Sequence, residues 1–205
     1  MYIFAPMANT TLPERNELFP IFLKLKQLRL LLVGGGYVGM EKLQAVVSNS
    51  PSAVITVVAI QISDEIKELV KEYSTITLIE KPYGISDLDN KDLAIAAIND
   101  PIVSRQVAMD ARSKGILVNA ADKPELCDFY LGSVVQKGNL KIAISTNGKS
   151  PTIAKRLKEV LSETLPDEID TLLNSMQTIR NKMSGDFTEK VKQLNELTKN
   201  LSQNK

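Results

Sequence analysis

The sequence predicts an α/β protein whose N-terminal part is a doubly wound parallel sheet, followed by a small antiparallel segment and a helical C-terminal part. Three observations lead to this fold class. A glycine-rich turn follows a short apolar run near residue 34, apolar runs then alternate with amphipathic segments as far as residue 122, and a hairpin pattern and helical periodicity come after that point.

The first predicted strand is 29–33, and it runs directly into Gly-x-Gly-x-x-Gly at Gly34, Gly36 and Gly39. In a strand-turn-helix context this pattern is the phosphate-binding turn of a Rossmann-type dinucleotide fold. Gly34 permits the tight turn, Gly36 lets the backbone approach a pyrophosphate, and Gly39 lets the helix pack closely on the strand. The pattern predicts a bound dinucleotide, whereas a glycine-rich turn without a ligand is the alternative reading.

The following segments alternate between strands and helices at the spacing of a parallel sheet with right-handed crossovers. Ser63 and the pair Asp100-Pro101 are typical helix starts, and Gly115 is a typical helix end. The apolar segment 19–23 is predicted to pack as a strap on the sheet edge. The predicted strands are 29–33, 53–60, 75–79, 93–97 and 116–120, and the predicted helices are 37–47, 63–73 and 101–114.

The pattern changes after Asp122. Segments 129–135 and 140–145 are predicted to form an antiparallel hairpin, and Ser150-Pro151 starts a helix that continues to Leu161. Two amphipathic helices follow, with apolar positions in 169–183 and in 191–201, whose stripes suit a core or a dimer seam. The expected domains are 1–125, 126–150 and 151–205.

Composition excludes several classes of function. Lys and Arg number 25 against 24 Asp and Glu, so there is no basic field that would favour nucleic acid. With one Cys and no His, neither a disulfide nor a Cys/His metal site is expected. No run reaches about 18 apolar residues, so we expect no membrane association and a cytoplasmic location. Proton transfer near neutral pH must use a carboxylate, Lys, Tyr, Cys or water.

Asp122 is the predicted catalytic acid or base. It follows a predicted strand at the carboxyl edge of the sheet, where ligands bind in such folds. The alternative reading is a turn former, because Asp-Lys-Pro is itself a turn signal. Asp128 is the competing carboxylate, and Cys127 is expected to be a small buried residue.

Two further stretches bear on ligand binding. The end of the second strand carries Gln61 where an acidic residue would hold the ribose, which weakens the usual NAD contact without favouring NADP. The loop 145–151 ends on a helix start with Lys149, Lys155 and Arg156 nearby, which would suit a polycarboxylate. A capped, solvated helix start is the alternative there.

Three motifs together resemble the precorrin-2 dehydrogenase family, which includes the N-terminal part of sirohaem synthases. They are GGGYVGMEK, LVNAADKPELCDF and KIAISTNGKSPTIAKRL, and the resemblance covers roughly residues 19–161. The sequence departs from the family pattern in three places, at residues 97–100, at Gly132 and at residues 146–148.

The resemblance implies NAD-dependent oxidation of precorrin-2, a tetrapyrrole with many carboxylates, to sirohydrochlorin in sirohaem biosynthesis. It implies that Asp122 is the essential aspartate and that a homodimer forms through the segment after the Rossmann part. The predicted cofactor contacts are Gly34, Gly36, Tyr37, Val38, Gly39, Ile60, Gln61 and Asn99. The predicted substrate contacts are Asn119, Thr146, Asn147, Lys149, Lys155 and Arg156, and no metal ligand is predicted.

Two alternatives remain open. Some members of the family also insert Fe(II) to give sirohaem, with the macrocycle itself supplying the nitrogen ligands. From another class, the chain could be a dinucleotide-sensing regulatory module, although such sensors usually keep the ribose-binding acid and do not need the basic loop.

Overall fold

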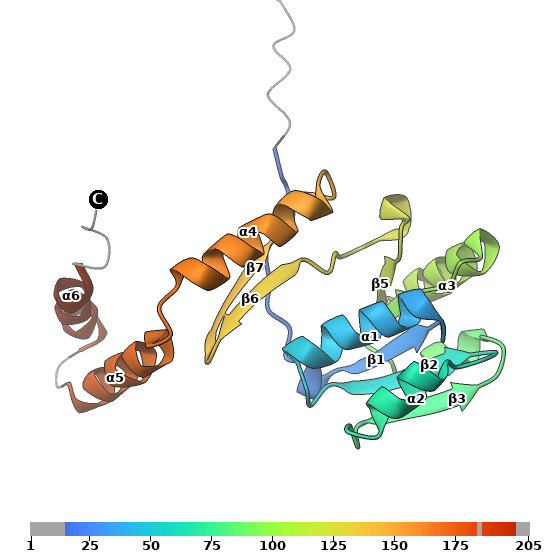
Figure 1. Cartoon of the computed structure of the whole chain (residues 1–205), viewed down its shortest axis with the longest axis horizontal. Helices are drawn as coiled ribbons and strands as arrows, with labels where there is room; N and C mark the ends of the chain where they lie inside the picture. The colour runs from blue at the N-terminus through green and yellow to red at the C-terminus, as the bar shows by residue number, and fades with distance from the viewer. Residues whose placement is uncertain (1–14, 184–185, 200–205) are drawn as a thin grey trace, which may run out of the picture. The chain divides into compact units, whose positions relative to one another are not determined.

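The computed structural model describes residues 15–183 and 186–199, which form two compact units (Figure 1). The first unit extends to Leu131 and the second begins at Gly132. The three domains expected from the sequence differ from this division. Residues 126–131 stay with the first unit because the Asp128 N–H donates to the Val118 carbonyl at 2.7 Å, and the hairpin packs with the helix that follows it.

The first unit contains a five-stranded parallel sheet with the order β3-β2-β1-β4-β5. The central strand β1 coincides with the predicted 29–33. The others differ from their predicted ranges by one residue, at both ends for β2 and β3 and at one end for β4 and β5. Apolar runs buried on both faces account for this agreement, and the predicted fold class is confirmed. The strands are β1 Arg29–Val33, β2 Val54–Ala59, β3 Ile76–Glu80, β4 Leu93–Ala96 and β5 Leu117–Ala120.

Helices cover both faces of this sheet. They are α1 Tyr37–Asn49, α2 Asp64–Val70 and α3 Pro101–Ser113. Leu30 and Leu32 of β1 point into a core that contains the buried residues of α1 and α2. Leu31 and Val33 point into the opposite core, which contains the buried face of α3. The period of two along the strand therefore places alternate side chains in two separate hydrophobic layers.

The predicted helix boundaries have the expected chemistry. The Ser63 hydroxyl accepts the Ile66 N–H at the start of α2, and the Asp100 carboxylate accepts two N–H groups at the start of α3. Gly115 has a φ of 69°, the left-handed conformation that glycine adopts readily after a helix. These side-chain contacts satisfy backbone donors and acceptors that helix ends leave unpaired.

The described part of the second unit consists of an antiparallel hairpin followed by three helices. Strand β6 pairs with β7, and α4 packs against both strands. The elements are β6 Ser133–Lys137, β7 Leu140–Ile144, α4 Pro151–Thr164, α5 Ile169–Lys182 and α6 Phe187–Thr198. Asp170 of α5 accepts the Asn139 N–H of the hairpin turn at 2.7 Å. Leu201, part of the last predicted stripe, lies outside the described residues.

Two expectations are wrong in detail. The first hairpin strand begins at Ser133 and not at Phe129, because the Phe129 carbonyl accepts a hydrogen bond from Asn119 of β5. The segment 19–23 does not pack as a buried strap, since Phe19 is 85% exposed and Phe22 67% exposed. Over the described ranges, none of the helices has the length and apolar character that crossing a bilayer requires.

Candidate active site

The site is built where the parallel strands end. The Gly34 N–H donates to the Val58 carbonyl at 2.9 Å, and the Ala97 N–H donates to the Val33 carbonyl at 2.8 Å. The turns after β1, β2 and β4 therefore meet at one edge of the sheet. Because β2 lies on one side of β1 and β4 on the other, this edge is the topological switch point at which open α/β sheets bind ligands.

Gly34 and Gly39 are required by close backbone packing. Gly34 has a φ of 129°, and a Cβ there would lie 2.1 Å from the Ala97 carbonyl oxygen. A Cβ on Gly39 would lie 2.3 Å from the Gly34 carbonyl oxygen. The two residues thus bring the start of α1 against the turn after β1, which is the packing role that the motif predicts for Gly39.

Gly36 differs from both because its surroundings are open. No heavy atom lies within 4 Å of the position that a Cβ would take, and the residue is exposed. It is the N-cap of α1, and no side chain caps this helix, in contrast to α2 and α3. Uncapped N–H groups and the positive end of the helix dipole attract anions. The turn fits a pyrophosphate lying against Gly36.

The other predicted cofactor residues follow three neighbouring strands. Tyr37 is 85% exposed and Ile60 is 78% exposed, while Gln61 and Asn99 are exposed and Val38 is half-buried. The turns after β1, β2 and β4 carry them, so all of them lie along the edge that contains Gly36. Their direct contacts with a cofactor stay predictions.

Two residues at this edge, Gly35 and Glu80, have roles that the sequence did not predict. Gly35 is a variable position of the motif, yet a Cβ there would lie 2.3 Å from the Gln61 carbonyl oxygen. Glu80 ends β3 and accepts the Ile62 N–H at 3.1 Å, and it forms an ion pair with Lys67 at 2.9 Å. This pairing lowers the pKa of Glu80. A carboxylate is therefore present beside the end of β2, but it comes from the adjacent strand.

Asp122 lies on the turn after β5. The Ala121 N–H donates to the Ala96 carbonyl at 2.9 Å, which extends the pairing of β5 with β4 up to this turn. Asp122 has a φ of 58°, a left-handed conformation that aspartate tolerates better than most residues. Its side chain is exposed, and no side chain in residues 15–183 or 186–199 pairs with the carboxylate. The carboxylate is available to a ligand.

Asp128 holds the base of the loop that presents Asp122. Its carboxylate accepts the Val118 N–H at 3.0 Å and pairs with Arg112 at 2.9 Å. Both carboxylate oxygens therefore have partners, which favours a structural role for Asp128 and leaves Asp122 as the candidate for chemistry.

Asn119 and Cys127 close the same loop from within. The Asn119 side chain is 6% exposed and donates to the Phe129 carbonyl at 2.9 Å, so its amide is used inside the fold. Its predicted contact with substrate stays a prediction. The Cys127 sulfur accepts the Ala120 N–H at 3.3 Å and lies 3.2 Å from the Ala120 carbonyl oxygen. Burial raises the pKa of this thiol.

The predicted substrate loop belongs to the second unit. The Thr146 hydroxyl accepts the Ser150 N–H at 3.2 Å, and Ser150 caps α4 through the Ile153 N–H. Lys149 and Lys155 are exposed, and Arg156 pairs with Glu159 at 2.6 Å. Asn147 has a φ of 53° in the same turn. The loop is an ordered, basic helix start, and its contacts with substrate stay predictions.

No group of three or more His, Cys, Asp or Glu side chains that could hold a metal ion occurs in the part of the chain that the structure describes. The acidic side chains nearest the candidate site instead have different roles. Glu80 and Asp128 are tied to backbone N–H groups, and Asp122 is exposed.

Comparison with known proteins matches two sequence families in order along the chain. Residues 21–133 match the family described as "Putative NAD(P)-binding". Residues 137–163 match the family described as "Sirohaem biosynthesis protein central". The first match covers the five-stranded sheet and the Asp122 loop, and the second covers β7 and most of α4.

Similar proteins include "Siroheme synthase" of Methylococcus capsulatus, 34% identical over 86% of this chain and 35% of the relative. "Siroheme synthase" of Nitrosomonas europaea is 33% identical over 83% of this chain and 36% of the relative. The chain therefore spans about a third of the length of these relatives. A solved structure titled "SirC, precorrin-2 dehydrogenase" superposes with a TM-score of 0.70 at 27% identity and covers 88% of this chain and 89% of its own.

Substitution of two glycines in the motif is expected to separate cofactor binding from folding. Gly36→Val places a side chain in the open space of the turn, so NAD affinity should fall at least about tenfold while stability changes by less than about 1 kcal/mol. Gly34→Ala should instead destabilise the fold by more than about 1 kcal/mol, because of its positive φ and the contact with Ala97. Calorimetric NAD titration and urea unfolding measure the two effects. Equal NAD affinity in Gly36→Val and wild type would contradict the assignment.

The Cys127 thiol is expected to react slowly in the folded protein. Its raised pKa leaves less thiolate at pH 8 than in the unfolded chain, and only the thiolate attacks iodoacetamide. Labelling followed by mass spectrometry should be at least about tenfold slower in the native protein than in urea. Equal rates would show that burial in the folded protein does not protect the sulfur.

Proposed function

Because the chain belongs to the putative NAD(P)-binding family, we propose that it is an NAD-dependent dehydrogenase that oxidises precorrin-2 to sirohydrochlorin. One observation carries the proposal. Gly36, an open and uncapped anion site, follows β1, and Asp122, whose carboxylate has no partner among the described residues, follows β5 at the same edge of the sheet. The match to a sirohaem biosynthesis family beyond this sheet, and the likeness to a precorrin-2 dehydrogenase structure, support the choice of substrate.

The reaction removes two hydrogens from the tetrapyrrole. Precorrin-2 and NAD⁺ give sirohydrochlorin, NADH and one proton. Bound NAD supplies the acceptor of the hydride. A side chain of the protein has to accept the proton that is released. Because the chain contains no histidine, a carboxylate is the natural base.

Asp122 is the residue that we assign to this proton. Its carboxylate oxygens are exposed and unpaired among the described residues, so they can accept the proton or orient the macrocycle. In a sheet of this order the nicotinamide end of the cofactor belongs between β1 and β4. Asp122 follows β5, which is the next strand, and this is the side where substrate would meet the cofactor.

The cofactor contacts are assigned to the turns after β1, β2 and β4, with Gly36 against the pyrophosphate.

We assign substrate carboxylates to the basic loop of the second unit, where Lys149, Lys155 and Arg156 supply positive charge. We also assign the protein to the cytoplasm, which is the location expected from the sequence.

A homodimer is the proposed assembly. Ala154 of α4 is buried in the second unit, whereas Ile153, Leu157 and Val160 are 53%, 44% and 55% exposed. These three residues share one face of the helix at i, i+4 and i+7. A second copy of the chain would remove this apolar face from water, which is favourable by about 25 cal/mol per Å².

Activity should depend on the Asp122 carboxylate and not on its backbone conformation. Asp122→Asn keeps a residue that tolerates positive φ but loses the base, so kcat for sirohydrochlorin formation should fall about 10²- to 10⁴-fold. NAD affinity should be unchanged. The control is Asp89→Asn, which removes an exposed carboxylate whose partner within the described ranges is Lys114.

Absorbance of sirohydrochlorin provides the assay. Full activity of Asp122→Asn would remove Asp122 from the mechanism, and NAD binding without any turnover by wild type would favour the dinucleotide-sensor alternative. Addition of Fe(II) to sirohydrochlorin in the same assay tests the iron-insertion alternative.

The dimer should depend on the exposed face of α4. Leu157→Glu places a charge in the proposed interface, so sedimentation should report a monomer where wild type gives a dimer. Lys158→Glu alters an exposed position next to it and should leave the dimer intact. A monomeric wild type at micromolar concentration would contradict the proposed assembly.

A further inference from the structure

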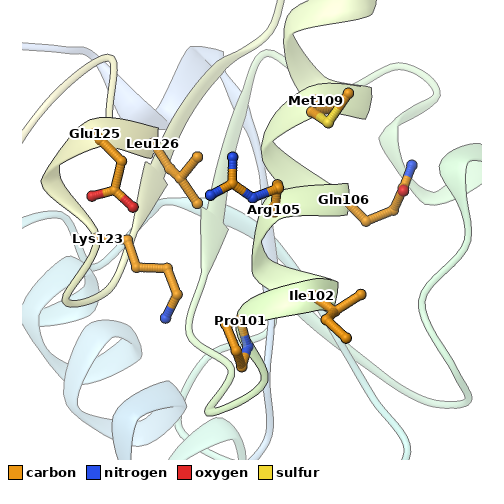
Figure 2. A pocket seen from close by; sticks show the side chains of 8 residues that line it. All are labelled: Pro101, Ile102, Arg105, Gln106, Met109, Lys123, Glu125 and Leu126. Atoms are coloured by element: carbon orange, nitrogen blue, oxygen red, sulfur yellow. The ribbon is translucent and has the colours of Figure 1, made fainter.

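A cavity of about 340 Å³ lies in the first unit between α3 and the loop after β5. Figure 2 shows its lining side chains, three of which come from the loop and five from α3. The loop residues begin at Lys123, directly after the proposed base. The lining residues are Pro101, Ile102, Arg105, Gln106, Met109, Lys123, Glu125 and Leu126.

Two cationic side chains of the cavity have no partner in the part of the chain that the structure describes. Arg105 extends from α3 toward the loop, and the Lys123 amino group extends toward Pro101 at the helix start (Figure 2). Neither side chain forms a hydrogen bond or an ion pair within residues 15–183 and 186–199, and this includes any ion pair with Glu125. The cavity therefore keeps a net positive charge that the fold does not neutralise.

This charge does not come from the helix dipole alone. The Asp100 carboxylate accepts the Ile102 and Val103 N–H groups at 2.8 and 3.2 Å, so the first donors of α3 are already used. An anion in the cavity would therefore be bound by the side chains of Arg105 and Lys123.

Apolar groups complete the lining. Leu126 is 5% exposed and belongs to the core, while Ile102 and Met109 are 79% and 60% exposed although both are large and apolar. A carboxylate attached to an apolar body matches this surface, because its charge can meet the two cations while its hydrocarbon part covers the exposed apolar atoms.

The cavity lies on the substrate side of the sheet edge. The proposed cofactor turns follow β1, β2 and β4, whereas this cavity is formed by the helix after β4 and the loop after β5. A group bound there would contact Lys123, the residue that follows Asp122 in the chain. The cavity is therefore suited to a side chain of the substrate on which Asp122 is proposed to act.

We propose that Arg105 and Lys123 form a carboxylate subsite that binds one acidic side chain of the substrate beside Asp122. This inference rests on the proposed function for the identity of the substrate, and it adds specificity residues that the sequence motifs did not indicate. Arg105 supplies a planar guanidinium suited to a carboxylate, and Lys123 supplies a second charge.

Turnover of precorrin-2 tests the subsite. Arg105→Gln and Lys123→Gln should each raise KM about tenfold, since each removes a charged hydrogen bond to a carboxylate, and NAD affinity should not change. The KM of the double variant should be higher still, and added salt should reduce the difference in KM between the variants and wild type. Lys71→Gln is the matched control, because Lys71 is an exposed residue at the end of α2 that does not line this cavity. Among the described residues its amino group pairs with Glu68.

A binding measurement separates failure of the subsite from failure of the proposed function. Titration with trimesate, a small aromatic tricarboxylate, should shift the methyl NMR signals of Ile102, Met109 and Leu126 in wild type and not in the double variant. Such shifts without precorrin-2 turnover would refute the proposed function and support the subsite. Turnover with an unchanged KM in the double variant, or equal shifts in both proteins, would overturn the subsite.

Discussion

The close backbone contact around Gly34 is the constraint on which the candidate site depends. Its N–H binds the end of β2, its Cα faces the carbonyl that follows β4, and its own carbonyl faces Gly39 at the start of α1. Three strands and one helix can approach so closely only because no Cβ occupies these positions. The switch point between β2 and β4 and the orientation of α1 both follow from this contact.

Helix capping then determines where the edge is open to an anion. Ser63 and Asp100 occupy the first N–H groups of α2 and α3, whereas Gly36 has no side chain to occupy those of α1. The same type of element therefore has two different roles at one edge of the sheet. Capped starts stabilise the fold, and the uncapped start remains available to a pyrophosphate.

The loop after β5 divides its polar groups in a similar way. Asp128, Asn119 and Cys127 bond to the backbone and close the loop, while Asp122 is presented at its turn without a partner in the described ranges. A reacting carboxylate benefits from such a frame, because neighbours that are already satisfied do not compete for it. Lys123 and Arg105 continue the same arrangement into the adjacent cavity.

Much of the first unit could be predicted from local patterns. The range 29–33, the helix starts at Ser63 and Pro101 and the order of strands and helices all depend on residues close together in the chain. The strap at 19–23 and the first hairpin strand were predicted wrongly, because hydrophobicity and β propensity do not report which partner a segment meets. Phe129 is held by Asn119 before the hairpin begins.

The sequence by itself determined the alternation of elements and the glycine motif, since each depends on periodicity or on a turn within a few residues. The catalytic role of Asp122 stays a prediction. Only the tertiary structure showed that Gly35 must lack a side chain, that Glu80 brings a carboxylate to the end of β2, and that Asn119 is used inside the loop. The physical reason is that these roles arise from contacts between separate segments. Arg105 and Lys123 line one cavity although they are 18 positions apart, and no local pattern encodes that proximity.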